Sequence, residues 1–450
     1  MESLSNIILT PSEIDITFEI LEIFIHEGQL KEAWKVLKSL ENSIYDSIYE
    51  RAIEGNFKTL LLFFTSALYF KEGNFEKSLL YCKDSIKNAL STYGDESYIA
   101  DMLLLSFHCM VNLGGDSLKS ASINAYFANA AICNIKACEN IIEYNIGFET
   151  YDFHNIISNT FFEEYTYKKV PFDAASSFLS NIANLESVTA TELSSGICSG
   201  STLNRFFNCT ILEVDILTLE AVTQRLGFDM LIFQNHFISK KEFEVISIKD
   251  KIEYSLLQNN FDEAERVLET FKQDSFLKKA INKQFSLKIE YLILSNKGQK
   301  DLGILMEALK LTIPKFKEEM LRSTRLTHQE INIIKEIAMF FCDVDYHRGV
   351  EIFEGLIRSI ERYYNEGKAK DLLLIPVFDS YCESLNMGGQ YQKSLEKNSY
   401  LETKILKSRK ITSLSKCFKH KVFALERLGF NEKASTYYNI ALTLESVLKL

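Results

Sequence analysis

The chain has 450 residues and a formal net charge of −11, with 46% hydrophobic residues, 18 glycines and 4 prolines. So few glycines and prolines argue against an all-β sandwich or barrel, which needs both residues in its many turns. The negative charge argues against a broad nucleic-acid-binding surface, which must displace counterions from phosphates. Neither a signal peptide nor an uncharged apolar run of about 18 residues occurs, so we expect a soluble, cytoplasmic, helical protein that spans no membrane.

One short motif recurs, first as EGQLKEAW at residues 27–34 and EGNFEKSL at residues 72–79. It returns in weaker form as QNNFDEAE, DVDYHRGV, GGQYQKSL and LGFNEKAS, beginning at residues 258, 343, 388 and 428. Gly or Asn can end one helix in the left-handed conformation, and the small residue further on lets the next helix approach closely. The motif therefore predicts antiparallel helix pairs that turn near Gly28, Gly73, Asn259, Asp345, Gly389 and Gly429, with one more pair around residues 296–309.

These motifs resemble the tetratricopeptide repeat in a degenerate form with long helices, over residues 14–113 and 248–448. The resemblance implies hairpins stacked into a superhelix. Between the two blocks, residues 120–143 suit a well-packed helix and residues 151–167 a capping helix. Pro171 marks a break after them, because the residue before a proline disfavours helix.

Residues 191–227 read TELSSGICSGSTLNRFFNCTILEVDILTLEAVTQRLG and carry the most specific pattern in the chain. Gly196 suits a tight turn between two short helices, and the hydroxyl of Ser199 can cap the second of them. We expect a small shared core of Leu193, Ile197, Leu203 and Phe206. The pattern resembles the helix-turn-helix of Xre/Cro/C1-type DNA-binding domains, and the resemblance makes the helix after Ser199 the recognition helix. It implies contacts to phosphates and bases from Ser199, Ser201, Thr202, Asn204 and Arg205.

This segment also departs from the family pattern. The family's Ile-Glu-Asn-Gly is Phe206-Phe207-Asn208-Cys209 here, and losing the glycine is expected to alter the exit from the recognition helix. The basic residues Arg205 and Arg225 face six acidic ones, Glu186, Glu192, Glu213, Asp215, Glu220 and Asp229. Phosphate contacts dominate DNA affinity, so the charge favours a module that no longer binds DNA.

Residues 307–316 and 328–334 resemble the repeat array of Gram-positive peptide-pheromone receptors of the Rgg/PlcR/PrgX type. The resemblance implies quorum sensing through a short peptide bound on the concave repeat surface, often by a dimer. In tetratricopeptide arrays the first helix of each pair lines that surface. Counting back from the turns assigns peptide contacts to Lys249, Glu253, Asp379, Glu383, Asn386, Lys416 and Lys419. The last two lysines could bind the terminal carboxylate of the peptide.

No pattern in the sequence points to catalysis, a metal or a cofactor. The nine cysteines form no CxxC pair, the seven histidines show no metal-ligand spacing, and no phosphate-binding glycine loop occurs. We therefore predict an all-α protein that is not an enzyme and needs no cofactor. Its predicted domains are an N-terminal repeat domain at residues 1–170, a degenerate helix-turn-helix module at 171–238 and a tetratricopeptide superhelix at 239–450.

Two functions fit this organisation. The first is a peptide-responsive transcriptional regulator that contacts double-stranded DNA through the central module and a peptide or protein segment through the C-terminal groove. The alternative is a scaffold that binds a protein or peptide and keeps only a vestigial DNA-binding module. The charge around the recognition helix separates the two hypotheses.

Overall fold

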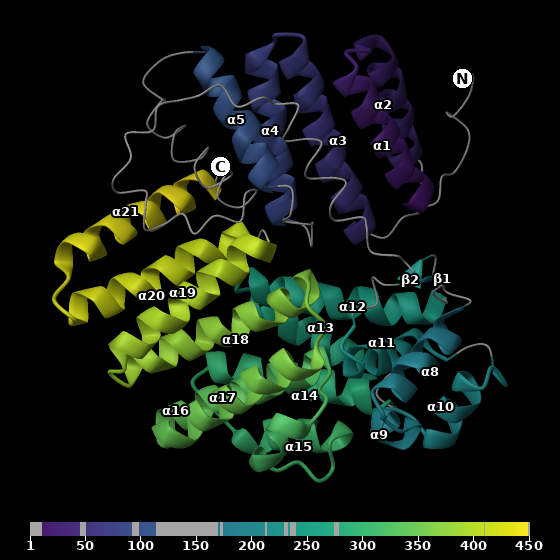
Figure 1. The fold of residues 1–450 in the computed structure, drawn as a ribbon, viewed down its shortest axis with the longest axis vertical. Helices are drawn as coiled ribbons and strands as arrows, with labels where there is room; N and C mark the ends of the chain where they lie inside the picture. Colours follow the sequence, from purple (N-terminus) through teal and green to yellow (C-terminus); the bar gives the residue numbers. More distant parts are fainter. Residues whose placement is uncertain are drawn as a thin grey trace. The chain divides into compact units, whose positions relative to one another are not determined.

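The computed structural model describes residues 11–45, 51–91, 99–113, 170–171, 174–211, 214–228, 233–234, 240–273, 279–408 and 410–448. These residues are predominantly α-helical, as predicted (Figure 1). The described strands are β1 (Val170–Pro171) and β2 (Phe233–Gln234), which pair in parallel over two residues. None of the described helices combines the length and the apolar character needed to cross a membrane. The helices predicted over residues 120–143 and 151–167 lie outside the described residues.

The chain divides into two compact units. One consists of residues 167–393, and the other consists of residues 1–166 together with residues 394–450. The first part of the latter contains α1 (Pro11–His26), α2 (Leu30–Tyr45), α3 (Arg51–Lys71), α4 (Phe75–Ser91) and α5 (Ile99–Leu113). Its second part contains most of α19 (Tyr391–Ser408), η7 (Ile411–Ser413), α20 (Leu414–Arg427) and α21 (Asn431–Leu448). The three domains predicted from the sequence divide the chain differently, and their boundaries stay a prediction.

The unit of residues 167–393 combines the helix-turn-helix segment with a row of helix pairs. The segment contains α8 (Ala175–Leu185), α9 (Ala190–Ser194), α10 (Gly200–Phe207) and α11 (Ile216–Arg225). The first helices of the pairs are α12 (Lys240–Leu257), α14 (Ala280–Asn296), α16 (His328–Val344) and α18 (Lys368–Met387). The helices that follow the first three are α13 (Phe261–Gln273), α15 (Leu302–Thr312) and α17 (Tyr346–Tyr363), with the 3-10 helix η6 (Glu318–Ser323) before α16.

The predicted hairpin turns are present. Gly28, Gly73, Asn259, Gly389 and Gly429 all have positive φ, from 54° to 84°, which is the left-handed conformation expected at a helix end. The turn at Asp345 works differently, because Asp345 has a φ of −147° and its carboxylate accepts a hydrogen bond from the Arg348 amide as the cap of α17. The further pair around residues 296–309 is α14 with α15, turning at Gly298.

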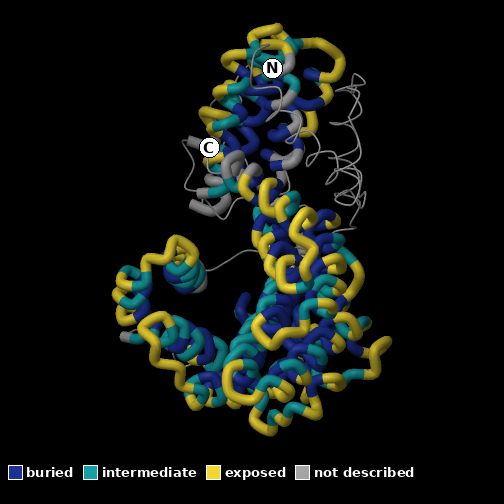
Figure 2. Tube along the Cα trace, turned by 90° about the vertical axis from the view of Figure 1, so that its left-hand side faces the viewer, coloured by how far each residue is buried: buried dark blue, intermediate teal, exposed yellow. Residues whose placement is uncertain are grey.

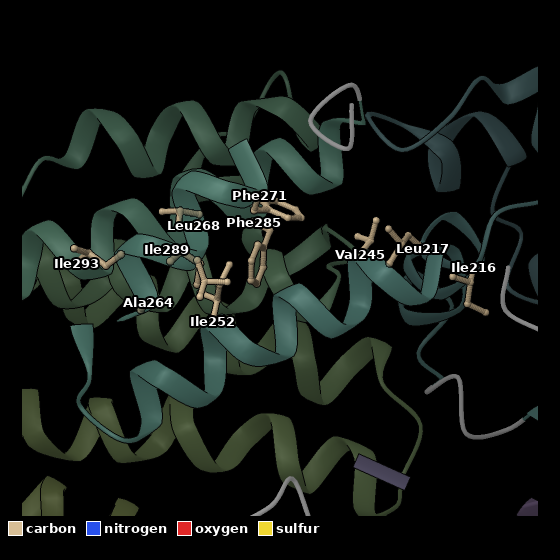
Figure 3. Close-up of a cluster of buried hydrophobic side chains, with 11 residues drawn as sticks. Ile216, Leu217, Val245, Ile252, Ala264, Leu268, Phe271, Phe285, Ile289 and Ile293 are labelled. Carbon is tan, nitrogen blue, oxygen red and sulfur yellow. The ribbon is translucent and has the colours of Figure 1, made fainter. Parts of the chain in front are cut away.

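The small residue of each motif is buried where paired helices meet, as predicted: Ala33, Ser78, Ala264, Gly349, Ser394 and Ala434. Figure 2 shows exposed residues gathered at the turns and buried ones along the helices between them. One core cluster runs along α12, α13 and α14 and includes Ile216 and Leu217 of α11 (Figure 3). The helix-turn-helix segment is therefore packed directly on the repeat helices of its own unit.

Candidate nucleic-acid interface and ligand cavity

The central module, defined here as residues 174–228, has its own small core. Leu193 of α9 and both Leu203 and Phe206 of α10 pack with Leu179 of α8, Leu219 of α11 and their neighbours. Three of the four core residues predicted from the sequence are thus confirmed. Ile197 differs, because it is only partly buried and lines a cavity next to the module.

Side-chain caps fix where the helices of the module begin. Thr189 and Glu192 form a capping box at the start of α9, and Asp215 caps α11. The Ser199 hydroxyl accepts a hydrogen bond from the Thr202 amide at 3.0 Å and lies within 2.9 Å of the Ser201 and Thr202 hydroxyls. This confirms that Ser199 caps the predicted recognition helix.

The outer face of α10 is accessible. Ser199, Ser201, Asn204 and Arg205 are exposed and Thr202 is half-buried, whereas Leu203 and Phe206 turn into the core. All five residues predicted to contact DNA therefore lie at or near one polar helix face. Their role as contacts to DNA stays a prediction.

The outer face of α10 and its surroundings carry little accessible positive charge. Arg205 is exposed, but Arg225, the other basic residue of the module, is only 4% exposed and its guanidinium points into the protein. The module thus offers DNA a single accessible cation, fewer than the sequence suggested.

Helix α10, the predicted recognition helix, ends in a Schellman motif. The Thr210 amide donates to the Arg205 carbonyl at 2.8 Å and the Cys209 amide to the Phe206 carbonyl at 2.9 Å. Cys209 itself adopts a φ of 53°, a left-handed conformation that favours glycine. The sequence predicted an altered helix exit because the glycine is absent. The exit here has the left-handed geometry that a glycine would favour, and Cys209 adopts it at the cost of backbone strain.

Replacing Cys209 by glycine should raise the free energy of unfolding of the unit by about 0.5–1 kcal/mol. The left-handed conformation costs a non-glycine residue roughly 1–2 kcal/mol, and the greater freedom of glycine in the unfolded chain offsets part of that gain. Chemical denaturation followed by circular dichroism measures the change. Cys209→Ser is the matched control, because it removes the thiol but keeps the strain and should leave stability nearly unchanged. Equal effects of both substitutions would assign the cost to the thiol instead.

Arg225 joins the module to the repeat helices. Its Nη1 donates to the carbonyls of Leu193 and Ser195 inside the module, at 2.9 and 2.7 Å. Its Nη2 donates to the Thr312 carbonyl at the end of α15, at 3.3 Å, and to Oε1 of Glu330 at 2.7 Å. Glu330 is fully buried at the start of α16, where it also forms a capping box with Thr327. One guanidinium therefore links α9, α11, α15 and α16.

Two glycines and a second arginine complete the docking. A Cβ on Gly196 would lie 2.3 Å from Cα of Thr312, so the turn of the helix-turn-helix touches α15 through bare backbone. The Gly227 carbonyl accepts hydrogen bonds from the backbone and side-chain amides of Asn365, both at 3.1 Å. Arg325 stacks on the Tyr363 ring and pairs with Glu186 at 2.9 Å. Contacts at the backbone of Gly196 and Gly227, together with the side-chain contacts of Arg325, therefore fix the orientation of the module on the repeat helices.

A cavity of about 490 Å³ lies beside this junction. The module contributes residues from α11 and Ile197, and the repeat helices contribute residues from α12, α14 and the start of α16. Because α12, α14 and α16 are the first helices of their pairs, the cavity opens on the face that the sequence predicted to bind ligand. A molecule in it would touch the central module and three repeat helices at once.

Two of the predicted peptide-binding residues line this cavity, Lys249 and Glu253 of α12. Lys249 is half-buried, with its ammonium 5.1 Å from the centroid of the Phe285 ring, and burial lowers the pKa of Lys249 to about 8. Glu253 lies 3.6 Å from the ammonium of Lys288 on α14. The structure therefore brings these two residues together around an accessible space.

The other predicted peptide contacts are elsewhere. Asp379, Glu383 and Asn386 follow one another along α18, outside the lining of the cavity, and Asn386 is buried. Lys416 and Lys419 belong to α20 in the other unit, where Lys419 pairs with Glu445 at 2.5 Å. Peptide binding by these five residues stays a prediction.

Sequence reasoning missed the residues that form the junction. Nothing in the sequence marked Thr312 or Gln284, and Arg225 was expected only as one of two basic residues among the acidic residues of the module. Gln284 is buried on α14 and donates to the Ala308 carbonyl at 3.1 Å and to the Thr312 hydroxyl at 2.6 Å. Capping-box spacing at Thr327 and Glu330 was the one available local clue, and it identifies a helix start and not a partner.

In the part of the chain that the structure describes, no group of three or more His, Cys, Asp or Glu side chains is placed to hold a metal ion.

No protein-family model and no curated protein matches the chain. The chain is similar to Bacillus thuringiensis PlcR in complex with the peptide PapR7 and DNA, with a TM-score of 0.40 and 16% identity over 62% of this chain and 96% of PlcR. It is also similar to ComR from S. thermophilus in complex with DNA and its signalling peptide ComS, with a TM-score of 0.35 and 14% identity over 61% of this chain and 94% of ComR.

Proposed function

We propose that the protein is a cytoplasmic transcription regulator that contacts duplex DNA through α10 and responds to a short peptide bound in the cavity at the junction. The observation that carries this proposal is that α11 is shared by the core of the module and the wall of the cavity. It packs in the core of the module with α10 and supplies part of the cavity wall. A ligand in the cavity can change how firmly the module docks on the repeat helices only if it binds the docked and undocked states with different affinities. Such a difference is expected because the ligand would touch α11 directly.

The geometry of α10 supports the DNA-binding part. The helix is capped, anchored by two apolar residues and polar on its outer face, and the docking contacts come from α9, α11 and the turns around them. Its outer face is thus available to a groove of the duplex.

A scaffold that binds peptide or protein without DNA remains the second candidate. The observation in its favour is charge, because burial of Arg225 leaves Arg205 as the accessible cation of the module against Glu186, Glu192 and Glu220. Each missing phosphate contact weakens binding to every sequence.

Duplex binding separates the two candidates. We expect the full chain to select a sequence from a random duplex pool and to bind it with an affinity that falls as salt rises. Arg205→Ala should weaken binding to all duplexes and reduce the salt slope by about 1, whereas Asn204→Ala should change sequence preference. Fluorescence anisotropy with labelled duplexes measures both effects.

Arg266→Ala is the matched control, because Arg266 is an exposed helix arginine on α13, outside the module. It should leave the salt slope unchanged. Absence of salt-sensitive duplex binding by the unmodified protein would leave the scaffold as the function.

A further inference from the structure

The size of the cavity limits its ligand. Its volume of about 490 Å³ lies in the range of roughly 300–1,000 Å³ typical of small-ligand sites. A compact space of this volume is about 10 Å across, which is the length of about three extended residues. A long extended peptide would therefore leave most of its residues outside.

The lining carries charges of both signs. Carboxylates come from Glu220 of α11 and from Asp250 and Glu253 of α12, and ammonium groups come from Lys249 of α12 and Lys288 of α14. Lys288 is 12% exposed, and its ammonium is 3.6 Å from Glu253. Lys249 lies over an aromatic ring, and no ion pair of the described residues holds it. Glu220 also accepts a hydrogen bond from the side-chain amide of Gln224 at 3.0 Å. A ligand with one charge of each sign can place both near lining charges of the opposite sign, whereas a singly charged ligand also meets lining charges of its own sign.

The rest of the wall is apolar or uncharged. Ile216 and Leu217 of α11, Ile246 of α12 and Phe285 of α14 provide an apolar side to the cavity. Gln284 is 1% exposed and already bonded to α15, so it shapes the wall without needing a partner from the ligand.

We infer that the cavity binds a small zwitterion, a free dipeptide or tripeptide with apolar side chains, whose carboxylate pairs with Lys249 and whose amino terminus meets the carboxylates of Glu220 and Asp250. This inference rests on the ligand site of the proposed function and deepens it. It makes both free termini part of recognition. The sensed molecule would then be a short fragment left by extensive but incomplete peptide hydrolysis, and not a long peptide.

The first test uses the full chain and free dipeptides and tripeptides built from Ala, Val, Leu and Phe. At saturation the best of them should raise the Tm by at least about 2 °C in differential scanning calorimetry. Its N-acetylated and C-amidated forms should each bind at least about 10-fold more weakly, because each loses a charge-assisted contact. An octapeptide that contains the same residues internally should not bind in the cavity.

The second test uses Lys249→Met, which keeps the aliphatic stem. It should weaken binding of the free peptide at least about 10-fold and leave the C-amide nearly unaffected, a pattern that a structural role of Lys249 would not produce. Lys251→Met is the matched control on the same helix, because Lys251 is outside the lining and pairs with Glu263 at 3.4 Å.

The pH dependence gives an independent readout. Lys249 has a pKa of about 8 in the free protein, and it faces Glu220, Asp250, Glu253, Lys279 and Lys288, with His328 also in the lining. A bound carboxylate raises the pKa of Lys249, so binding takes up a proton above pH 8. Affinity should therefore fall as pH rises above 8. The amino terminus of the peptide also loses its proton in this range, with a pKa of about 8, so Lys249→Met should make the fall less steep and leave the part that comes from the ligand.

The inference is overturned if no free dipeptide or tripeptide raises the Tm, or if blocking either terminus leaves affinity unchanged. If the octapeptide bound and no free dipeptide or tripeptide did, the inference would be overturned. The proposed function would still stand, because a short peptide would bind and DNA binding is measured separately.

Discussion

Replacing Arg225 by methionine should lower the free energy of unfolding of the unit of residues 167–393 by about 3–5 kcal/mol. The reason is the partner that stays behind. Glu330 is fully buried and pairs with Arg225 at 2.7 Å, so its carboxyl group would be left in a buried site without a cation, where either keeping the charge or taking up a proton costs stability. Three backbone carbonyls, those of Leu193, Ser195 and Thr312, would also lose a donor.

The measurement separates the two units of the chain. Trp34, the single tryptophan, lies on α2 in the other unit, so its fluorescence reports that unit. Far-UV circular dichroism reports the helices of both. In a denaturant titration we expect Arg225→Met to move a circular dichroism transition to lower denaturant and to leave the fluorescence transition of Trp34 in place.

The double variant Arg225→Met with Glu330→Gln is the control for the ion pair. Glutamine can keep the capping box with Thr327 but carries no charge, so the double variant should be more stable than Arg225→Met alone. If the single variant unfolded at the same denaturant concentration as the unmodified protein, the buried pair would not hold the module in solution.

The repeats could be predicted from the sequence because their signal is local. A turn residue, a following apolar residue and a small residue lie within eight positions, and Gly73, Phe75 and Ser78 do in the structure what that spacing implies. The helix-turn-helix was readable for the same reason, since Ser199 and Leu203 act within one or two turns of helix. Local chemistry of this kind needs no knowledge of what packs against it.

The junction could not be predicted, because its partners are far apart in the chain. Arg225 and Glu330 are 105 residues apart, and an arginine at a helix end is usually solvated. Helix-face counting reached Lys249 and Glu253, which line the cavity. The same counting reached Asn386, which is buried, because counting gives the direction of a side chain but not what covers it.

Glycine geometry at the junction leads to a second large effect. Gly227 has a φ of 83°, and a Cβ there would lie 2.0 Å from the carbonyl oxygen of Tyr363. Gly298 has nearly the same φ, 79°, in the turn between α14 and α15, but a Cβ there would meet nothing within 4 Å. The two positions therefore share the backbone strain of an added side chain and differ only in the docking contact.

We expect Gly298→Ala to lower the free energy of unfolding by about 0.5–1 kcal/mol, because the lower freedom of alanine in the unfolded chain offsets part of its left-handed strain. Gly227→Ala should lower it by about 1.5–4 kcal/mol, because overpacking against the backbone of Tyr363 adds roughly 1–3 kcal/mol to the same net strain. The shift must also weaken the bonds that Asn365 donates to the Gly227 carbonyl. Denaturant titrations of both variants by circular dichroism compare them directly. Equal losses would mean that the carbonyl of Tyr363 does not touch Gly227 in solution, and the module would then be held by its other contacts, among them those of Arg225 and Gly196.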